Sequence, residues 1–142
     1  MDQLFTHQTL FDYHQIWEKM KLGETLTDDA ALIADAMKEH PEFDPIWPEG
    51  EMALHPQEVG NTIVNPLIHT GLHVIVQKQL QNQSPEEVSI AFNTLLENGV
   101  SEHEAKHQLG GLWGNLYFQS IRQGAPLDDW TYIQSLRGII GK

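Results

Sequence analysis

The sequence contains no cysteine among its 142 residues. Disulfide frameworks, thiolate zinc sites and cysteine nucleophiles are therefore excluded. Any metal ion must be held by nitrogen and oxygen ligands, which come from histidine, aspartate and glutamate side chains. Eight histidines are present to supply such nitrogens.

Basic residues are also scarce. Eight lysines and arginines stand against twenty aspartates and glutamates, and the formal net charge is -12 at pH 7. Affinity for nucleic acids comes largely from basic side chains that neutralise phosphates, so we expect no nucleic-acid partner. We interpret the acidity as a property that keeps the protein soluble.

Long apolar runs are absent as well. No window approaches the about 18 apolar residues that a membrane-spanning helix needs, and the first residues lack the basic and apolar regions of a secretory signal. We therefore expect a soluble cytoplasmic protein with no membrane partner. The chain is long enough to fold without disulfides, and we expect a single domain over residues 1–142.

Apolar residues recur with a period close to 3.6 in several segments, and this spacing predicts helices. No segment alternates with period 2 for long enough to predict a strand. The fold class is therefore all-α, and short connections favour an antiparallel helical bundle of about six helices. The predicted helices cover residues 8–22, 27–40, 65–81, 84–98, 101–123 and 128–139. Their expected N-caps after the first helix are Thr27, Asn65, Ser84, Ser101, and Asp128 or Asp129.

Residues 41–62 hold four prolines and two glycines. Such a density of helix breakers excludes a regular element of any length and predicts a long loop between the second and third helices. Loops of about twenty residues are uncommon in compact domains and often pack through their own side chains. We expect a packed cover over one end of the bundle, made by the apolar side chains Phe43, Ile46, Trp47 and Leu54.

Two histidine pairs carry the only chemistry that stands out. His69 and His73 lie one turn apart on the helix that begins at Asn65, and His103 and His107 have the same spacing on a later helix. Each pair can direct two imidazoles at one point, and the helical period places both pairs on the apolar side. Buried ring nitrogens need partners, and we expect a divalent metal ion held by these four histidines.

Neutral imidazole suits zinc, nickel and iron, and zinc is the first expectation. If all four histidines coordinate, the ion is structural; if one stays outside the shell, a bound water can be activated for hydrolysis. No general base is evident beside either pair, which favours a non-enzymatic protein over a metal-dependent hydrolase.

The main rival hypothesis has no metal. The histidines would then form a buried cluster within an interaction module, which contacts a second copy of the chain or another protein through Trp47, Trp113 or small residues of the fifth helix. A core that responds to pH is a third hypothesis, because clustered histidines become charged below about pH 6.5. The sequence leaves the identity of any small-molecule ligand unknown.

Known catalytic patterns fit poorly. A zincin-type peptidase needs a glutamate directly after the first histidine of a pair, and Thr70 stands there. A di-iron carboxylate bundle needs two Glu-x-x-His motifs, and only Glu104 and His107 have that spacing. The remaining histidines are interpreted as surface or core residues, with His40 at a helix C-terminus beside Glu42.

Several motifs along the chain belong together. They are His40-Pro41-Glu42, Asn65-Pro66-x-x-His69-x-x-x-His73, Gln79 and His103-x-x-x-His107, the last followed by Leu, Gly and Trp. Through these motifs the chain, from about Trp17 to Leu136, resembles the uncharacterised bacterial domain-of-unknown-function family DUF1841. The family carries no assigned activity, so the resemblance supports the helical fold and the histidines and implies no reaction.

The chain departs from the family pattern at one place. The resemblance implies His-x-x-x-His-x-x-x-Glu on the later helix and another glutamate one turn further, but Gly111 and Asn115 occupy these positions. If those carboxylates are ligands in relatives, the site here is all-histidine, recruits Glu42 or Glu104, or binds no metal.

Overall fold

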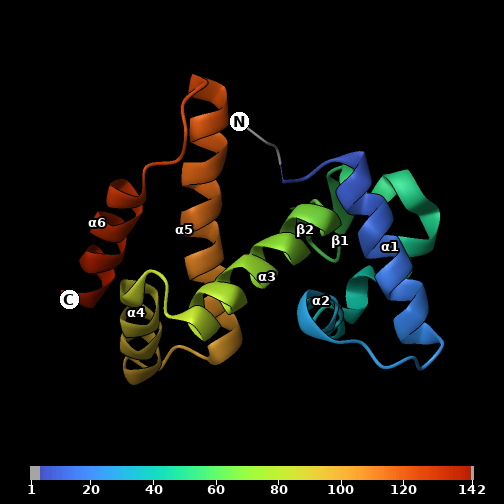
Figure 1. Cartoon of the computed structure of the whole chain (residues 1–142), viewed down its shortest axis with the longest axis horizontal. Helices are drawn as coiled ribbons and strands as arrows, with labels where there is room; N and C mark the ends of the chain where they lie inside the picture. Colours follow the sequence, from blue (N-terminus) through green and yellow to red (C-terminus); the bar gives the residue numbers. More distant parts are fainter. Residues whose placement is uncertain (1–3, 142) are drawn as a thin grey trace. The chain divides into compact units, whose positions relative to one another are not determined.

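The computed structural model describes residues 4–141, and six α-helices dominate them (Figure 1). The prediction of an all-α fold is confirmed. Within residues 4–141, no helix combines the length and the apolar character needed to cross a membrane. The helices are α1 (His7–Lys21), α2 (Asp28–Lys38), α3 (Pro66–Asn82), α4 (Glu86–Glu97), α5 (Glu102–Gln123) and α6 (Asp129–Ile140).

Local capping bonds account for several helix ends. Ser101 accepts a hydrogen bond from the backbone N–H of Glu104 at the start of α5, and Asp128 accepts one from Trp130 at the start of α6. Gly124 ends α5 in the left-handed conformation with φ 67°, as expected of a glycine that follows a helix. These caps confirm the boundaries that the sequence predicts for α5 and for the start of α6.

The predicted cap at Ser84 is wrong. The N-cap residue of α4 is Pro85, and no side chain among the described residues caps this helix. Ser84 instead follows the end of α3, where its backbone N–H donates to the carbonyl of Gln79. The Ser-Pro-Glu-Glu pattern therefore marks the right turn but the wrong capping residue.

The prediction that the loop between α2 and α3 holds no regular element is also wrong. A proline at the first position of a helical turn loses no hydrogen bond, so a proline-rich stretch can fold into short elements. These elements are the 3-10 helices η1 (Pro41–Phe43) and η2 (Trp47–Leu54), and the strands β1 (Gln57–Val59) and β2 (Thr62–Val64).

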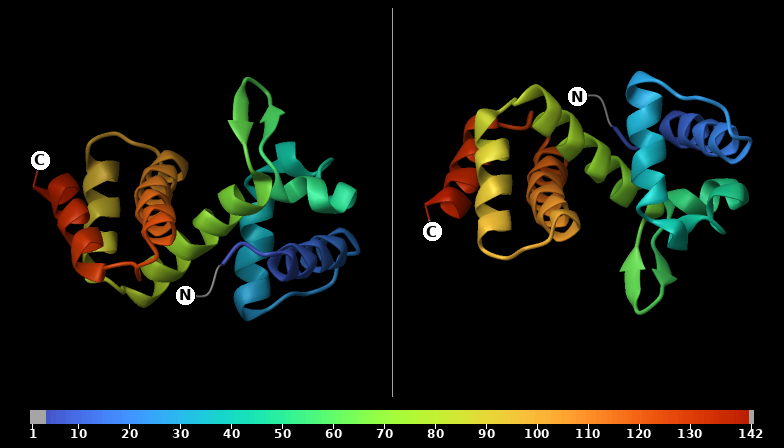
Figure 2. Two further views of the ribbon diagram at one scale, coloured as in Figure 1. Left: turned by 90° about the horizontal axis from the view of Figure 1, so that it is seen from above. Right: turned by 90° about the horizontal axis from the view of Figure 1, so that it is seen from below.

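The two strands form a small antiparallel hairpin in which Glu58 pairs with Ile63 (Figure 2). Gly60 and Asn61 make the turn, and Gly60 has a positive φ of 64°. Strands of three residues are too short to show alternation, but a Gly-Asn pair between two short segments is a hairpin signal. The sequence therefore held a turn signal for this element but no strand signal.

The chain divides into two compact units, with the boundary between Val74 and Ile75 inside α3. In the first unit, α1 packs against α2 and η2. Phe43 and Trp47 are buried in its core, so the predicted packing of these side chains is confirmed. The buried core residues are Leu10, Tyr13, Met37, Phe43, Trp47, Ala53 and Leu67.

The second unit has its own core, in which α4 packs on α5 and α6 packs on both (Figures 1 and 2). The hydroxyl of Tyr132 on α6 donates to Oε1 of Gln79 on α3 over 2.7 Å. Burial raises the pKa of Tyr132, so its hydroxyl stays protonated as a donor. The single domain over residues 1–142 and its antiparallel bundle stay predictions. The buried core residues are Val76, Val88, Ala91, Leu95, Ala105, Leu109, Tyr132 and Leu136.

Two N-cap residues offer a matched test of capping. Ser101 makes a side-chain bond at the start of α5, whereas Thr27 makes none at the start of α2 within the described chain. Ser101→Ala is expected to lower the free energy of unfolding by about 1 kcal/mol, and Thr27→Ala by clearly less, in urea denaturation followed by circular dichroism. Equal losses in the two variants would contradict this expectation.

Candidate metal centre

His40 stands at the turn between α2 and η1. Pro41 begins η1, and a residue before a proline is disfavoured in the helical conformation, so α2 cannot continue through His40. The His40 side chain is only 2% exposed, and its ring stacks on Phe43 with the ring centroids 5.3 Å apart. The turn and the stacked ring together fix the position and the plane of this imidazole.

His69 and His73 lie one turn apart on α3, as their spacing predicts, with ring centroids 5.1 Å apart. Asn65 fixes the start of this helix, because its side chain accepts from the N–H of Ile68 and donates to the carbonyl of Leu54. His73 is 4% exposed, and His69 is half-buried. The N-cap therefore sets both imidazoles relative to η2.

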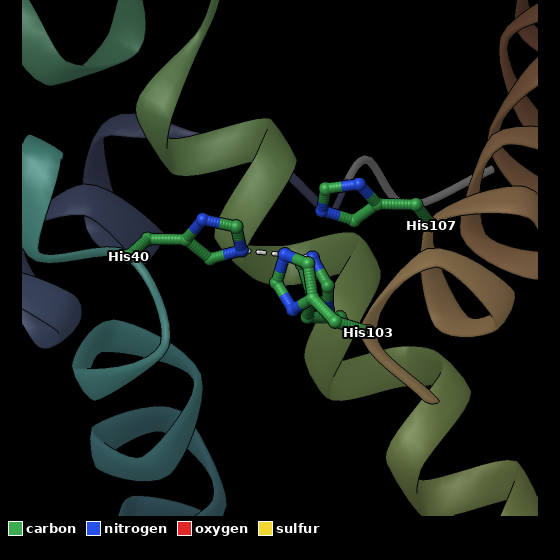
Figure 3. Close-up of side chains that lie close together, drawn as sticks. His40, His103 and His107 are labelled. Atoms are coloured by element: carbon green, nitrogen blue, oxygen red, sulfur yellow. Dashed lines mark hydrogen bonds between the residues drawn. The ribbon is translucent and has the colours of Figure 1, made fainter. Parts of the chain in front are cut away.

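The three imidazoles form a cluster within the first unit. The ring centroid of His40 lies 4.5 Å from that of His69 and 4.6 Å from that of His73. Nε2 of His40 and Nε2 of His73 share a hydrogen bond of 2.9 Å, drawn as the dashed line that starts at His40 in Figure 3. The His69 ring stands perpendicular to the rings of His40 and Phe43.

Two carboxylates lie behind the facing nitrogens. Oε2 of Glu42 is 3.1 Å from Nδ1 of His40, which is a hydrogen-bond distance. Oε2 of Glu39 is 4.0 Å from Nδ1 of His73, which is an ion-pair distance but too long for a hydrogen bond. Each of these two rings thus presents Nε2 to the other ring and Nδ1 to a carboxylate. Histidines that bind metals usually have such an outer partner, which orients the ring and raises its basicity.

The pKa of Glu42 reflects its contact with His40. Desolvation by partial burial raises the pKa of this carboxyl. Hydrogen bonds with its own backbone and with His40, and the nearby charges of His40 and His69, lower the pKa by more, so it lies below the ordinary value of 4.5. Glu42 is therefore ionised at neutral pH and acts as an acceptor.

The facing nitrogens fit a metal ion after a small adjustment. Two nitrogens bound to one tetrahedral zinc at about 2.0–2.1 Å are about 3.3–3.4 Å apart. From the observed 2.9 Å, the two rings need to separate by about half an ångström. Imidazole nitrogens of this kind bind zinc, nickel and iron.

His103 and His107 form a second pair, on α5 of the second unit (Figure 3). Their ring centroids are 4.2 Å apart, and each offers a ring nitrogen within 4.8 Å of the other. Nδ1 of His107 lies 3.8 Å from Oε2 of Glu104, and both imidazoles are half-buried. This pair can direct two nitrogens at one point, as its spacing predicts.

The structure thus brings His69 to His73 and His103 to His107, and it adds His40 to the first pair. Helical spacing alone marks His40 only as a helix-terminal residue, because the contact with α3 joins segments far apart in the sequence. A signal was nevertheless present, since the His-Pro-Glu step is one of the motifs on which the family resemblance depends.

The other three histidines are exposed or half-buried. His7 and Glu51 are both exposed and lie 3.1 Å apart. His14 lies 3.7 Å from Glu18, one turn along α1. His55 is exposed. Contacts of this kind on the surface contribute little to stability.

A family model described as a domain of unknown function (DUF1841) matches residues 6–138. The match confirms the resemblance of the motifs and extends beyond the predicted span at both ends. No curated protein and no solved structure matches the chain.

The lowered pKa of Glu42 gives a pH prediction. A carboxyl whose pKa is lower in the folded state stabilises that state above its ordinary pKa, and this stabilisation is lost as the pH falls through the folded-state pKa. Glu42→Gln is therefore expected to be less stable than the wild type at about pH 7, with a gap that closes below about pH 4.5. Urea denaturation at several pH values measures the gap, with the exposed Glu58→Gln as control. A gap that persists unchanged at about pH 3 would argue against this role.

Proposed function

We propose that this chain, which belongs to the DUF1841 family, binds one divalent transition metal ion through Nε2 of His40 and Nε2 of His73. Zinc is the expected ion, and nickel or iron suit the same ligands. The observation that carries the proposal is the pair of buried imidazoles that face each other at 2.9 Å with a carboxylate behind each ring.

Burial makes this contact informative. Two neutral imidazoles can place only one proton between their facing nitrogens, and any additional charge is costly away from water. A metal ion accepts both lone pairs at once, and the two carboxylates offset its charge. The same geometry also supports the rival hypothesis of a metal-free hydrogen-bonded cluster, so metal content is the deciding measurement.

We further propose His103 and His107 as the ligands that complete the shell. Support comes from the sequence: they are the second His-x-x-x-His pair in a chain without cysteine, and structural zinc sites take four ligands. The sequence predicts His69 as a ligand, and in the proposed shell His40 takes its place. Because its ring packs perpendicular to His40 and Phe43, we assign it to the packing around the ligands.

The proposed role of the ion is structural. Four imidazoles close a tetrahedral shell and leave no position for a reactive water. Glu39 and Glu42 lie on the Nδ1 side of their histidines, behind the nitrogens that would face the ion, so neither is placed as a general base. A hydrolase would need both an open position and such a base.

The test is the metal content of protein purified without an affinity tag. We expect about one equivalent of metal in the wild type and in the control His7→Ala/His55→Ala, which removes two exposed histidines, and none in His40→Ala/His73→Ala. Zinc added after chelation should raise the Tm, since an ion that binds only folded protein contributes about 2.7 kcal/mol at 100 times its Kd. A wild type that carries no metal, and whose Tm does not change when zinc or nickel is added, would contradict the proposal.

A second double variant, His103→Ala/His107→Ala, separates the ligand sets. Loss of the ion supports the four-histidine shell. Retention of the ion would show that the first unit holds it and that water fills the other positions. Cobalt(II) substitution gives an independent readout, because the geometry of its shell changes its visible absorption.

A further inference from the structure

A groove that is open to solvent lies between α3, α4 and the start of α5, within the second unit. Its volume of about 480 Å³ lies within the range of roughly 300–1,000 Å³ that is typical of small-molecule sites. Of the described residues that line it, none is a histidine proposed as a metal ligand. The groove is therefore a separate feature of the molecule.

The helical period explains why the lining residues meet. Side chains three and four positions apart lie on one face of a helix. Both α3 and α4 contribute a set with this spacing, so the two helices turn matching faces toward the groove. These residues are Gln77, Leu80 and Gln81 on α3, and Ser89, Phe92 and Asn93 on α4.

Carboxamides dominate the polar part of the lining. Each of them has an oxygen that accepts hydrogen bonds and an NH₂ group that donates them. Within the described chain their side chains bond to no other residue, whereas Gln79 on the same helix accepts from Tyr132. They are therefore available to a ligand that both donates and accepts. The four carboxamides are those of Gln77, Gln81, Gln83 and Asn93.

Gln83 has a backbone conformation that a side chain disfavours. It follows α3, where the N–H of Ser84 donates to the carbonyl of Gln79, and its φ is 50°. Glycine is the usual residue at such a position, because a Cβ makes left-handed backbone unfavourable. Other residues with this backbone recur at functional sites. The conformation of Gln83 therefore indicates a use for its carboxamide in the groove.

The rest of the lining is apolar or neutral in sum. Leu80 and Phe92 are half-buried and pack against the core of the second unit, so they give the groove an apolar surface. Glu102 and Lys106 are its two charged residues, and their charges are opposite. The lining thus carries no net charge, although the whole chain carries -12.

We infer that this groove binds an uncharged pyranose saccharide. Hydroxyl groups both donate and accept hydrogen bonds, as carboxamides do. The C–H face of a pyranose is apolar and packs well on an aromatic ring such as that of Phe92. A mainly polar lining disfavours an apolar ligand, and a lining without net charge gives no preference for an anion. The inference goes beyond the proposed function and does not depend on a metal ion.

Titration of the full chain with cellobiose, maltose and diacetylchitobiose tests the inference. Proton–nitrogen spectra should show shifts of the carboxamide signals of the groove at up to about 10 mM saccharide. Gln81→Ala should weaken binding by about 3–10-fold, the effect of one lost hydrogen bond. Phe92→Leu, which keeps an apolar side chain but removes the ring, should also weaken it. Gln134→Ala removes an exposed carboxamide of α6 outside the groove and is the matched control.

Gln83→Gly separates binding from folding. Glycine adopts a positive φ without steric cost, so the Tm of this variant should equal or exceed that of the wild type. Its saccharide affinity should nevertheless fall by about 3–10-fold. Unchanged affinity in both Gln83→Gly and Gln81→Ala would overturn the inference, as would a wild type whose signals no saccharide shifts. Shifts caused only by adenosine or triglycine would assign the groove to another ligand class and equally overturn it.

Discussion

Two imidazole nitrogens, one from His40 and one from His73, meet at 2.9 Å where both side chains are almost wholly buried. A buried polar group without a partner costs roughly 1–3 kcal/mol, so this contact has to be satisfied by a shared proton or by an ion. The residues around the two rings hold them in this contact. Phe43 stacks on the first ring, α3 carries the second, and a carboxylate faces the outer nitrogen of each. The first unit thus places a polar contact beside an apolar core.

The positions of His40 and His73 are each set by a separate local feature of the chain. The end of α2 and the proline that follows place His40, and the cap at Asn65 places His73 on α3. The two histidines are nonetheless 33 positions apart, so their meeting depends on the fold of the segment between them. That segment is anchored by the bond from Asn65 to the carbonyl of Leu54 and by Trp47, which is fully buried. The bond to Leu54 therefore ties the start of α3, the helix that carries His73, to the end of η2.

The helices could be predicted because their signals are local. Ser101 and Asp128 cap their helices through bonds to residues two or three positions away, and such bonds are visible as sequence patterns. The His-x-x-x-His pairs follow from the same local geometry. The place of His40 could not be derived in this way, since it depends on how a proline-rich stretch folds against α3. The hairpin at Gly60 was missed for a different reason. Its strands of three residues are too short to show a recognisable alternation of apolar and polar side chains.

A divalent ion held by neutral imidazoles keeps both of its positive charges, and an unbalanced buried charge is costly. The family resemblance implies carboxylates on the later helix, but Gly111 and Asn115 stand there and both are exposed. In this chain Glu39 and Glu42 lie behind the imidazoles instead, and their two negative charges match those of a divalent ion. Carboxylates in that outer position balance charge through hydrogen bonds and leave every coordination position to nitrogen. In the proposed site, the charges of Glu39 and Glu42 would therefore offset the charge of an ion bound by His40 and His73.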